Sequence, residues 1–136
     1  MILCDTGPLI AVIDPGQGDV HAHCSGLLKH HQGKLVTTLP CLTEAMYFAY
    51  GLGGRPLQNV LWRIIASDVF EIQLLDKSDC RRLEDLMERY SNVPMDFADA
   101  SLVVTAEKRG VRKILTLDND FRIYRFEDGG YFEVIP

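Results

Sequence analysis

The sequence predicts an α/β fold in which a mostly parallel sheet is covered by helices on both faces. Short apolar runs of strand length alternate along the chain with longer segments of helical periodicity. No internal repeat, low-complexity tract or linker divides the 136 residues. Parallel strands need crossover connections, and helical crossovers cover both faces of their sheet. We therefore expect one domain over residues 1–136, which is an ordinary domain length.

The first half of the chain predicts two strands, each followed by a helix. Residues 1–5 form an apolar run that reaches an acid, as expected of a buried strand. Helical periodicity predicts a short helix over residues 19–32, and residues 35–38 predict the second strand. Pro40 then suits the first turn of a helix that runs to about Tyr50, because proline lacks the amide proton that this turn leaves unpaired.

The middle of the chain predicts a break, then a helix, a strand and a helix. Residues 51–56 are rich in glycine and interrupt the helical pattern. Residues 57–67 are amphipathic at helical spacing, whereas residues 70–74 alternate between apolar and polar as a half-buried strand does. A further helix is expected over residues 78–90.

The last third of the chain gives the clearest helix, over residues 96–109. Gly110 closes it, because glycine readily adopts the left-handed conformation that ends many helices. Residues 114–117 and 131–135 predict the remaining strands. Strands and helices thus continue to alternate to the end of the chain, as a parallel sheet requires.

Composition excludes several classes of protein. Hydrophobic residues make up 47% and charged residues 24%, which is typical of a folded, soluble domain rather than a disordered chain. No apolar run reaches membrane-spanning length and no signal peptide is recognisable, so we expect a cytoplasmic protein without a membrane partner. The cysteines are widely spaced and are expected to be reduced and mostly buried: Cys4, Cys24, Cys41 and Cys80.

Acidic residues follow two of the predicted strands. Ligands of parallel sheets bind beyond the carboxyl ends of the strands. Asp5 ends the first strand, and Asp118 directly follows the strand at 114–117. Asp5 could instead cap the helix that follows it. Asp120 lies two residues beyond Asp118, where a turn residue is the alternative interpretation.

Further acids occur early in two predicted helices. Glu44 lies four residues after Pro40, where the helix dipole favours a negative charge, and it could be a solvated first-turn acid. Asp96 and Asp99 lie on neighbouring positions of one helical face. Asp96 suits a helix cap. Asp99 precedes an apolar run, where an unpaired charge is costly and a metal ion would compensate for it.

Four of these acids predict a metal site. Asp5, Glu44, Asp99 and Asp118 can converge at one edge of a parallel sheet, where their charges would repel unless a divalent cation neutralised them. Oxygen ligands select Mg²⁺ first and Mn²⁺ next, and such ions can activate water and stabilise a leaving oxygen at phosphate. The net charge of −5 argues against simple electrostatic binding of nucleic acid. Bound cations would invert that potential locally.

Four stretches, in this order and at this spacing, resemble the PIN-domain family, specifically its VapC-like toxin ribonucleases: LCDTGPLIA at 3–11, TEA at 43–45, DFADASLV at 96–103 and LTLDNDF at 115–121. The resemblance implies a three-layer α/β/α sandwich and a Mg²⁺- or Mn²⁺-dependent endoribonuclease. The acids of the family carry over to Asp5, Glu44, Asp99 and Asp118 as catalytic metal ligands. Thr6, Asp96 and Asp120 would support them.

The resemblance also implies partners, namely an RNA substrate, a cognate antitoxin and a second copy of the chain. Scattered bases are candidates for RNA contacts, with solvated surface charge as the alternative: Arg55, Arg63, Lys108, Arg109, Arg112, Arg122 and Arg125. Several apolar residues exceed what a small helix pair must bury, and they would bind the antitoxin, form a homodimer or belong to the core: Tyr47, Tyr50, Leu52, Leu61 and Trp62.

Two other functions are weighed against the ribonuclease. A catalytically silent module of the same fold could bind RNA or protein without cleaving it. Other phosphate enzymes are disfavoured by missing motifs. The first strand leads into Asp5-Thr6-Gly7 instead of the D-x-D of haloacid-dehalogenase-type phosphatases, and the chain has no G-x-x-x-x-G-K-[ST] loop.

Overall fold

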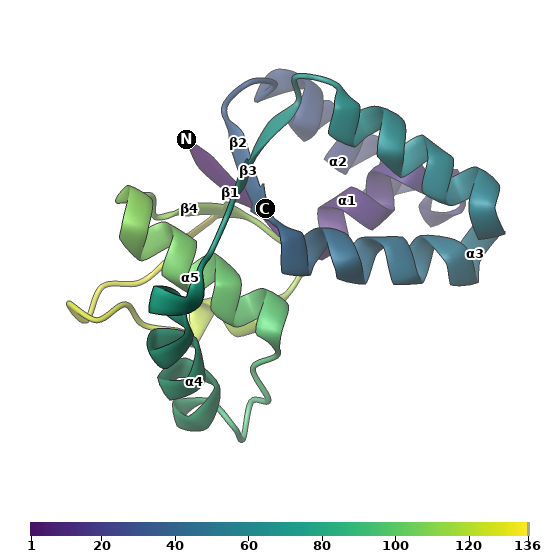
Figure 1. Ribbon diagram of the computed structural model, residues 1–136. Coiled ribbons are helices and arrows are strands. Elements are labelled where there is room, and N and C mark those ends of the chain that lie inside the picture. Colours follow the sequence, from purple (N-terminus) through teal and green to yellow (C-terminus); the bar gives the residue numbers. More distant parts are fainter. Residues whose placement is uncertain (136) are drawn as a thin grey trace.

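A five-stranded sheet forms the centre of the computed structural model, which describes residues 1–135 (Figure 1). The strands are β1 (Ile2–Cys4), β2 (Leu35–Thr38), β3 (Phe70–Gln73), β4 (Lys113–Leu115) and β5 (Glu133–Ile135). They lie in the order β3-β2-β1-β4-β5, and every neighbouring pair is parallel. The predicted α/β fold with a parallel sheet is therefore confirmed.

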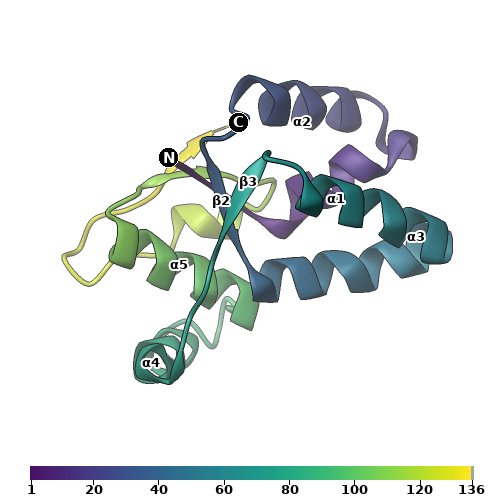
Figure 2. The same ribbon diagram turned by 45° about the horizontal axis from the view of Figure 1, so that its top comes forward.

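Helices cover both faces of this sheet. They are α1 (Thr6–Ile13), α2 (Asp19–His30), α3 (Leu39–Ala66), α4 (Cys80–Arg89) and α5 (Phe97–Arg109), with short 3₁₀ turns η1 (Pro15–Gln17), η2 (Lys77–Asp79) and η3 (Asn119–Arg122). Figure 2 shows α1, α2 and α3 on one side of the strands and α4 and α5 on the other. Within residues 1–135, every helix is too short or too polar to cross a bilayer.

Alternation along the strands divides the core into two layers, because successive strand side chains point to opposite faces. Leu3 packs with the helices α4 and α5, whereas its neighbours Ile2 and Cys4 pack with α1 and α3. The neighbouring strands follow the same rule. Val36 and Ile114 lie in the core layer beside α4 and α5, and Leu35 and Leu115 lie in the layer beside α1 and α3. The three-layer α/β/α sandwich is thus built by the pattern of apolar residues.

The α3 helix differs from the two helices that the sequence predicted around a break at 51–56. Helical structure runs from Leu39 to Ala66, and only Gly53 and Gly54 leave helical geometry. Gly54 has φ 65° and ψ −157°, a conformation that side-chain-bearing residues rarely adopt. The break is real but two residues long, and the second arm of α3 packs back into the core layer that holds α1 and the first arm of α3.

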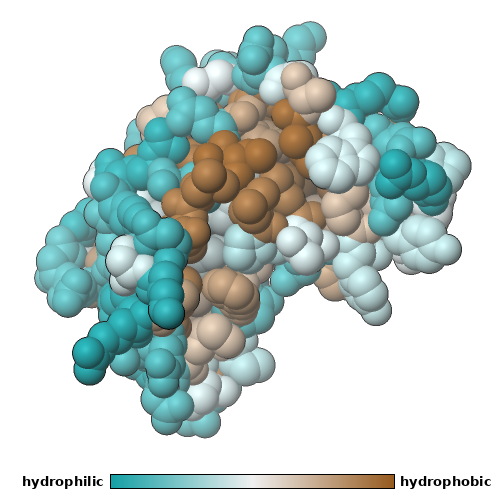
Figure 3. Space-filling view, viewed as in Figure 1, coloured by the Kyte–Doolittle hydropathy of each residue, from teal (hydrophilic) through white to brown (hydrophobic). Residues whose placement is uncertain are grey.

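Most of the apolar residues that the sequence predicted to exceed the needs of the core are exposed. Tyr47, Tyr50, Leu52 and Trp62 are at least half exposed, whereas Leu61 is fully buried. Figure 3 shows apolar side chains gathered in the hollow over β3 and beside α3. A groove there is lined mainly by Leu39, Leu42, Met46, Trp62, Ile65 and Ile72.

The cysteines follow their prediction. Cys4, Cys24 and Cys41 are buried, Cys80 is exposed, and all are free thiols. Burial raises the pKa of Cys41 to about 12, so this thiol stays protonated at neutral pH. The fold is held by its core rather than by disulfides.

Replacing Gly110 with alanine is expected to destabilise the protein by about 1 kcal/mol, because a side chain strains the left-handed conformation. Gly110 has φ 66° and ψ 31°, and an added Cβ would meet no atom of the described residues within 4 Å, so the backbone conformation is what opposes the change. Gly26→Ala, inside α2 and equally open, is the control and should stabilise the protein slightly. Urea denaturation measures both, and equal effects would contradict the assignment.

Candidate active site

Five acids from four parts of the chain line one pocket at the carboxyl ends of β1 and β4. Asp5 follows β1, Asp118 follows β4, Glu44 lies on α3, and Asp96 and Asp99 begin α5. The strands β1 and β4 are parallel neighbours, which brings their following acids to the same edge. The four acids predicted to act together are therefore neighbours in space, with Asp96 beside them.

Asp5 is both a helix cap and a member of the pocket, although the sequence left these as alternatives. Its Oδ1 accepts a hydrogen bond of 2.7 Å from the Thr6 amide at the start of α1. Its Oδ2 accepts one of 2.7 Å from the Thr116 hydroxyl. With 6% of its surface exposed, the carboxylate is fixed on both oxygens.

Thr116 is a site residue that the sequence analysis missed. Its hydroxyl donates to Asp5 and accepts a bond of 3.0 Å from the Asp118 amide. One buried hydroxyl thus links the acids that follow two neighbouring strands. The available signal was a hydroxyl residue two positions before Asp118.

Asp96 and Asp99 have different roles at the start of α5. Asp96 caps the helix, because its Oδ1 accepts a bond of 2.8 Å from the Asp99 amide. Asp99 is only 7% exposed, and its Oδ2 accepts a bond of 2.7 Å from the Tyr124 hydroxyl. Tyr124 is fully buried and was also missed. The predicted cap at Asp96 is confirmed.

Thr6 and Asp120, the other predicted supporting residues, differ in their relation to the pocket. Thr6 lines the pocket, and its hydroxyl donates to the Cys41 carbonyl at 3.3 Å. Asp118 caps η3 by accepting a bond of 2.8 Å from the Asp120 amide. Asp120 lies within this turn and outside the set of pocket-lining residues. Ile10, Phe48 and Leu117 add apolar wall.

Burial makes the pocket a poor place for negative charge. Desolvation, reinforced by the neighbouring acids, raises the pKa of Asp5 to about 6, of Glu44 to about 7 and of Asp99 to about 8. The hydrogen bonds from Thr116 and Tyr124 act in the opposite direction on Asp5 and Asp99. No lysine or arginine is among the described residues that line the pocket. A bound cation would remove this electrostatic cost.

The chemistry of the donors fits Mg²⁺ or Mn²⁺, since each charged side chain among the described lining residues is a carboxylate. In the conformation described for residues 1–135, no three His, Cys, Asp or Glu side chains form a ready ligand shell. The carboxylate oxygens of Asp5 and Asp99 instead accept hydrogen bonds from the Thr6 amide and from the Thr116 and Tyr124 hydroxyls. The four metal ligands therefore remain a prediction that rests on the shared pocket and on its charge.

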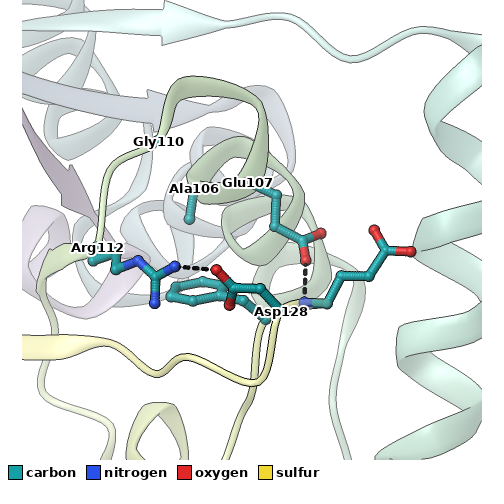
Figure 4. Close-up of a pocket in the computed structure, with 7 residues that line it drawn as sticks. Ala106, Glu107, Gly110, Arg112 and Asp128 are labelled. Carbon is teal, nitrogen blue, oxygen red and sulfur yellow. Dashed lines mark hydrogen bonds and ion pairs between the residues drawn. The ribbon is translucent and has the colours of Figure 1, made fainter.

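The basic residues predicted to contact RNA lie outside the pocket lining. Lys108 pairs with Asp79 at 3.0 Å and Arg109 with Glu71 at 2.6 Å, at the opposite end of α5 from Asp99. Figure 4 shows Arg112 paired with Asp128 in another pocket, beside Glu107. Arg125 donates to backbone carbonyls at 122–124, whereas Arg55, Arg63 and Arg122 are exposed.

Comparisons with known proteins agree with this geometry. The family model described as PIN domain matches residues 2–127. Ribonuclease VapC26 of Mycobacterium tuberculosis is 28% identical over 136 residues, which span 99% of this chain and 100% of the relative. The crystal structure of Mycobacterium tuberculosis VapC20, described as a sarcin-ricin loop cleaving toxin, aligns over 100% of both chains with a TM-score of 0.82 and 20% identity, which shows the fold. Since the family model covers nearly the whole chain, this protein belongs to the PIN domain family.

Proposed function

We propose that this protein is a metal-dependent endoribonuclease that hydrolyses RNA phosphodiesters as the toxin of a type II toxin–antitoxin pair. One observation carries the proposal, namely the pocket in which five carboxylates meet and whose lining, within residues 1–135, includes no lysine or arginine. The named activities of VapC26 and VapC20, a ribonuclease and a toxin that cleaves the sarcin-ricin loop, support RNA as the substrate class.

In this mechanism Asp5, Glu44, Asp99 and Asp118 hold Mg²⁺, for which Mn²⁺ can substitute. The ion, when bound, supplies Lewis-acid stabilisation of the phosphate charge and lowers the pKa of water. The chain contributes fixed carboxylates, because the Thr6 amide and the Thr116 hydroxyl restrain Asp5. The apolar wall at Ile10, Phe48 and Leu117 limits bulk water beside the scissile phosphate.

RNA must approach an acidic protein, so we propose that the cation contributes much of the attraction for the phosphate. Arg122 and Arg125 follow Asp118 on the same segment and are our candidates for contacts with the flanking backbone. Lys108, Arg109 and Arg112 would first have to leave their acidic partners.

We further propose that the apolar groove beside α3 (Figure 3) contacts an antitoxin or a second copy of the chain. The VapC names of the relatives support an antitoxin partner.

A ribonuclease toxin acts where cellular RNA lies, so we propose the cytoplasm as its location.

RNA cleavage under metal control tests this function. The purified protein is incubated with a structured RNA in Mg²⁺, in Mn²⁺ and in EDTA. Internal cleavage is expected with either ion and none in EDTA, because the acids bind the substrate phosphate only through a cation. Cleavage that persists in EDTA would contradict metal dependence, and intact RNA under every condition would contradict the nuclease.

A catalytically silent binding module is the second candidate, and one observation favours it. Among the described residues, no three carboxylates are arranged to ligate one ion, and a module that binds no metal needs no such arrangement. Calorimetry with Mn²⁺ separates the candidates, since the ribonuclease requires binding in the micromolar to millimolar range and the module requires none.

Replacing Thr116 with valine is expected to lower kcat for RNA cleavage about 10-fold, the lower end of the effect of removing a partner of a metal ligand. Valine keeps the shape of threonine but gives no donor to Asp5 and no acceptor to the Asp118 amide. Thr116→Ser keeps the hydroxyl and should retain most activity. Steady-state kinetics measure both variants, and equal losses would show that the methyl group matters instead.

A further inference from the structure

The buried hydroxyl of Tyr124 lies against the acid pocket from behind. We propose that Tyr124 is a positioning residue that orients the Asp99 carboxylate for the cation, an inference that rests on the proposed function. The hydroxyl donates to Asp99 Oδ2 at 2.7 Å. Tyr124 is fully buried and lies outside the pocket lining, so it acts through Asp99 and does not touch the substrate.

Asp99 needs an external restraint because its own helix fixes only its backbone. Its amide donates to Asp96, which places the first turn of α5. The carboxylate can still rotate about its side-chain torsions. A donor at a fixed position restricts that rotation. Within residues 1–135, the Tyr124 hydroxyl is the donor that hydrogen-bonds to the Asp99 carboxylate.

The tyrosine ring is itself held firmly by two aromatic neighbours. It packs edge to face against Tyr90 and Phe121, with centroid distances of 5.1 Å and 5.2 Å. Tyr90 is in turn fixed, because its hydroxyl accepts a bond of 2.9 Å from the Arg125 amide. The Tyr124 hydroxyl therefore has little freedom to follow Asp99 if that carboxylate turns away.

One short segment then controls two of the acids. Asp118 begins the segment as the cap of η3, and Tyr124 ends it two residues beyond that turn. The link through Tyr124 ties the end of this segment to α5, while Thr116 ties its beginning to Asp5. The relative placement of Asp99 and Asp118 is thus set by residues 118–124 and not by the sheet alone.

Removing only the hydroxyl tests this role. Tyr124→Phe keeps the ring and leaves Asp99 Oδ2 without its donor. We expect the dissociation constant for Mn²⁺, measured by calorimetry without RNA, to rise about 10-fold, and kcat to fall about 10-fold with an unchanged KM for RNA, as for other partners of metal ligands. Partial recovery of kcat at high Mg²⁺ is also expected.

Tyr131→Phe is the control, because it removes the hydroxyl of an exposed tyrosine that lies outside the lining of the acid pocket. It should leave the affinity for Mn²⁺ within about 2-fold of the wild type. If both variants lose Mn²⁺ affinity equally, or if Tyr124→Phe matches the wild type, the positioning role is wrong. A wild type that neither binds Mn²⁺ nor cleaves RNA overturns the proposed function, and this role falls with it.

Discussion

Replacing Asp99 with asparagine is expected to lower kcat for RNA cleavage on the order of 1,000-fold, equivalent to ~4 kcal/mol of transition-state stabilisation. Asparagine keeps the size of the side chain and an oxygen that can accept from Tyr124, so the fold should persist. It removes the charge that holds the cation. Steady-state cleavage of a structured RNA in saturating Mg²⁺ measures the loss.

The same variant should be more stable than the wild type when metal is absent. Asp99 is buried and its pKa is raised to about 8, so its charged form opposes folding at pH values above this. Thermal melting in EDTA at pH 8.5 should therefore favour Asp99→Asn. Asp85→Asn, on the exposed face of α4, is the control and should change neither quantity. Cleavage by Asp99→Asn at the wild-type rate would remove Asp99 from the metal site.

The metal-free protein is expected to lose stability as the pH rises from about 4.5 to about 8, by roughly 2 kcal/mol or more. The pKa values of Asp5, Glu44 and Asp99 are raised above those of unfolded chains. Through this window the folded state therefore binds more protons than the unfolded state, so stability falls with rising pH. Glu44 is partly exposed and contributes less than its shift suggests.

Mg²⁺ should reverse that loss at pH 8 and have little effect at pH 4.5, where protonated acids cannot bind it. For a chain of this length, the expected rise in melting temperature is roughly 5–10 °C. Asp76 and Asp128 do not obscure the window, because their pKa values are lowered and their contribution is lost only in more acidic solution. Stability that is flat from pH 4.5 to 8 in EDTA, or unaffected by Mg²⁺ at pH 8, would contradict this account.

The convergence of the acids could be predicted because it depends on topology. Parallel pairing of β1 with β4 places whatever follows each strand at one edge, so Asp5 and Asp118 were expected to meet. Asp99 could be identified because an acid is costly beside the apolar run of α5. These inferences use local pattern and the general geometry of sheets.

The groups that restrain the acids could not be predicted in the same way. Tyr124 reaches Asp99 across 25 positions of sequence and Thr116 reaches Asp5 across 111, and neither contact leaves a periodic signal. The same reason hid the pairing of Lys108 with Asp79 and of Arg109 with Glu71. Local sequence pattern also underestimated the length of α3, because the stretch predicted as a break at 51–56 leaves helical geometry at only two residues.

A crystal structure after soaking in Mn²⁺ tests the central proposal most directly. The account predicts at least one ion in the pocket, within about 2.0–2.3 Å of carboxylate oxygens of Asp5, Asp99 or Asp118, or joined to them through ordered water. Asp99→Asn crystals should bind less Mn²⁺ under the same conditions. Wild-type crystals whose pocket stays free of Mn²⁺ at millimolar concentration, with the carboxylates turned away from one another, would contradict it.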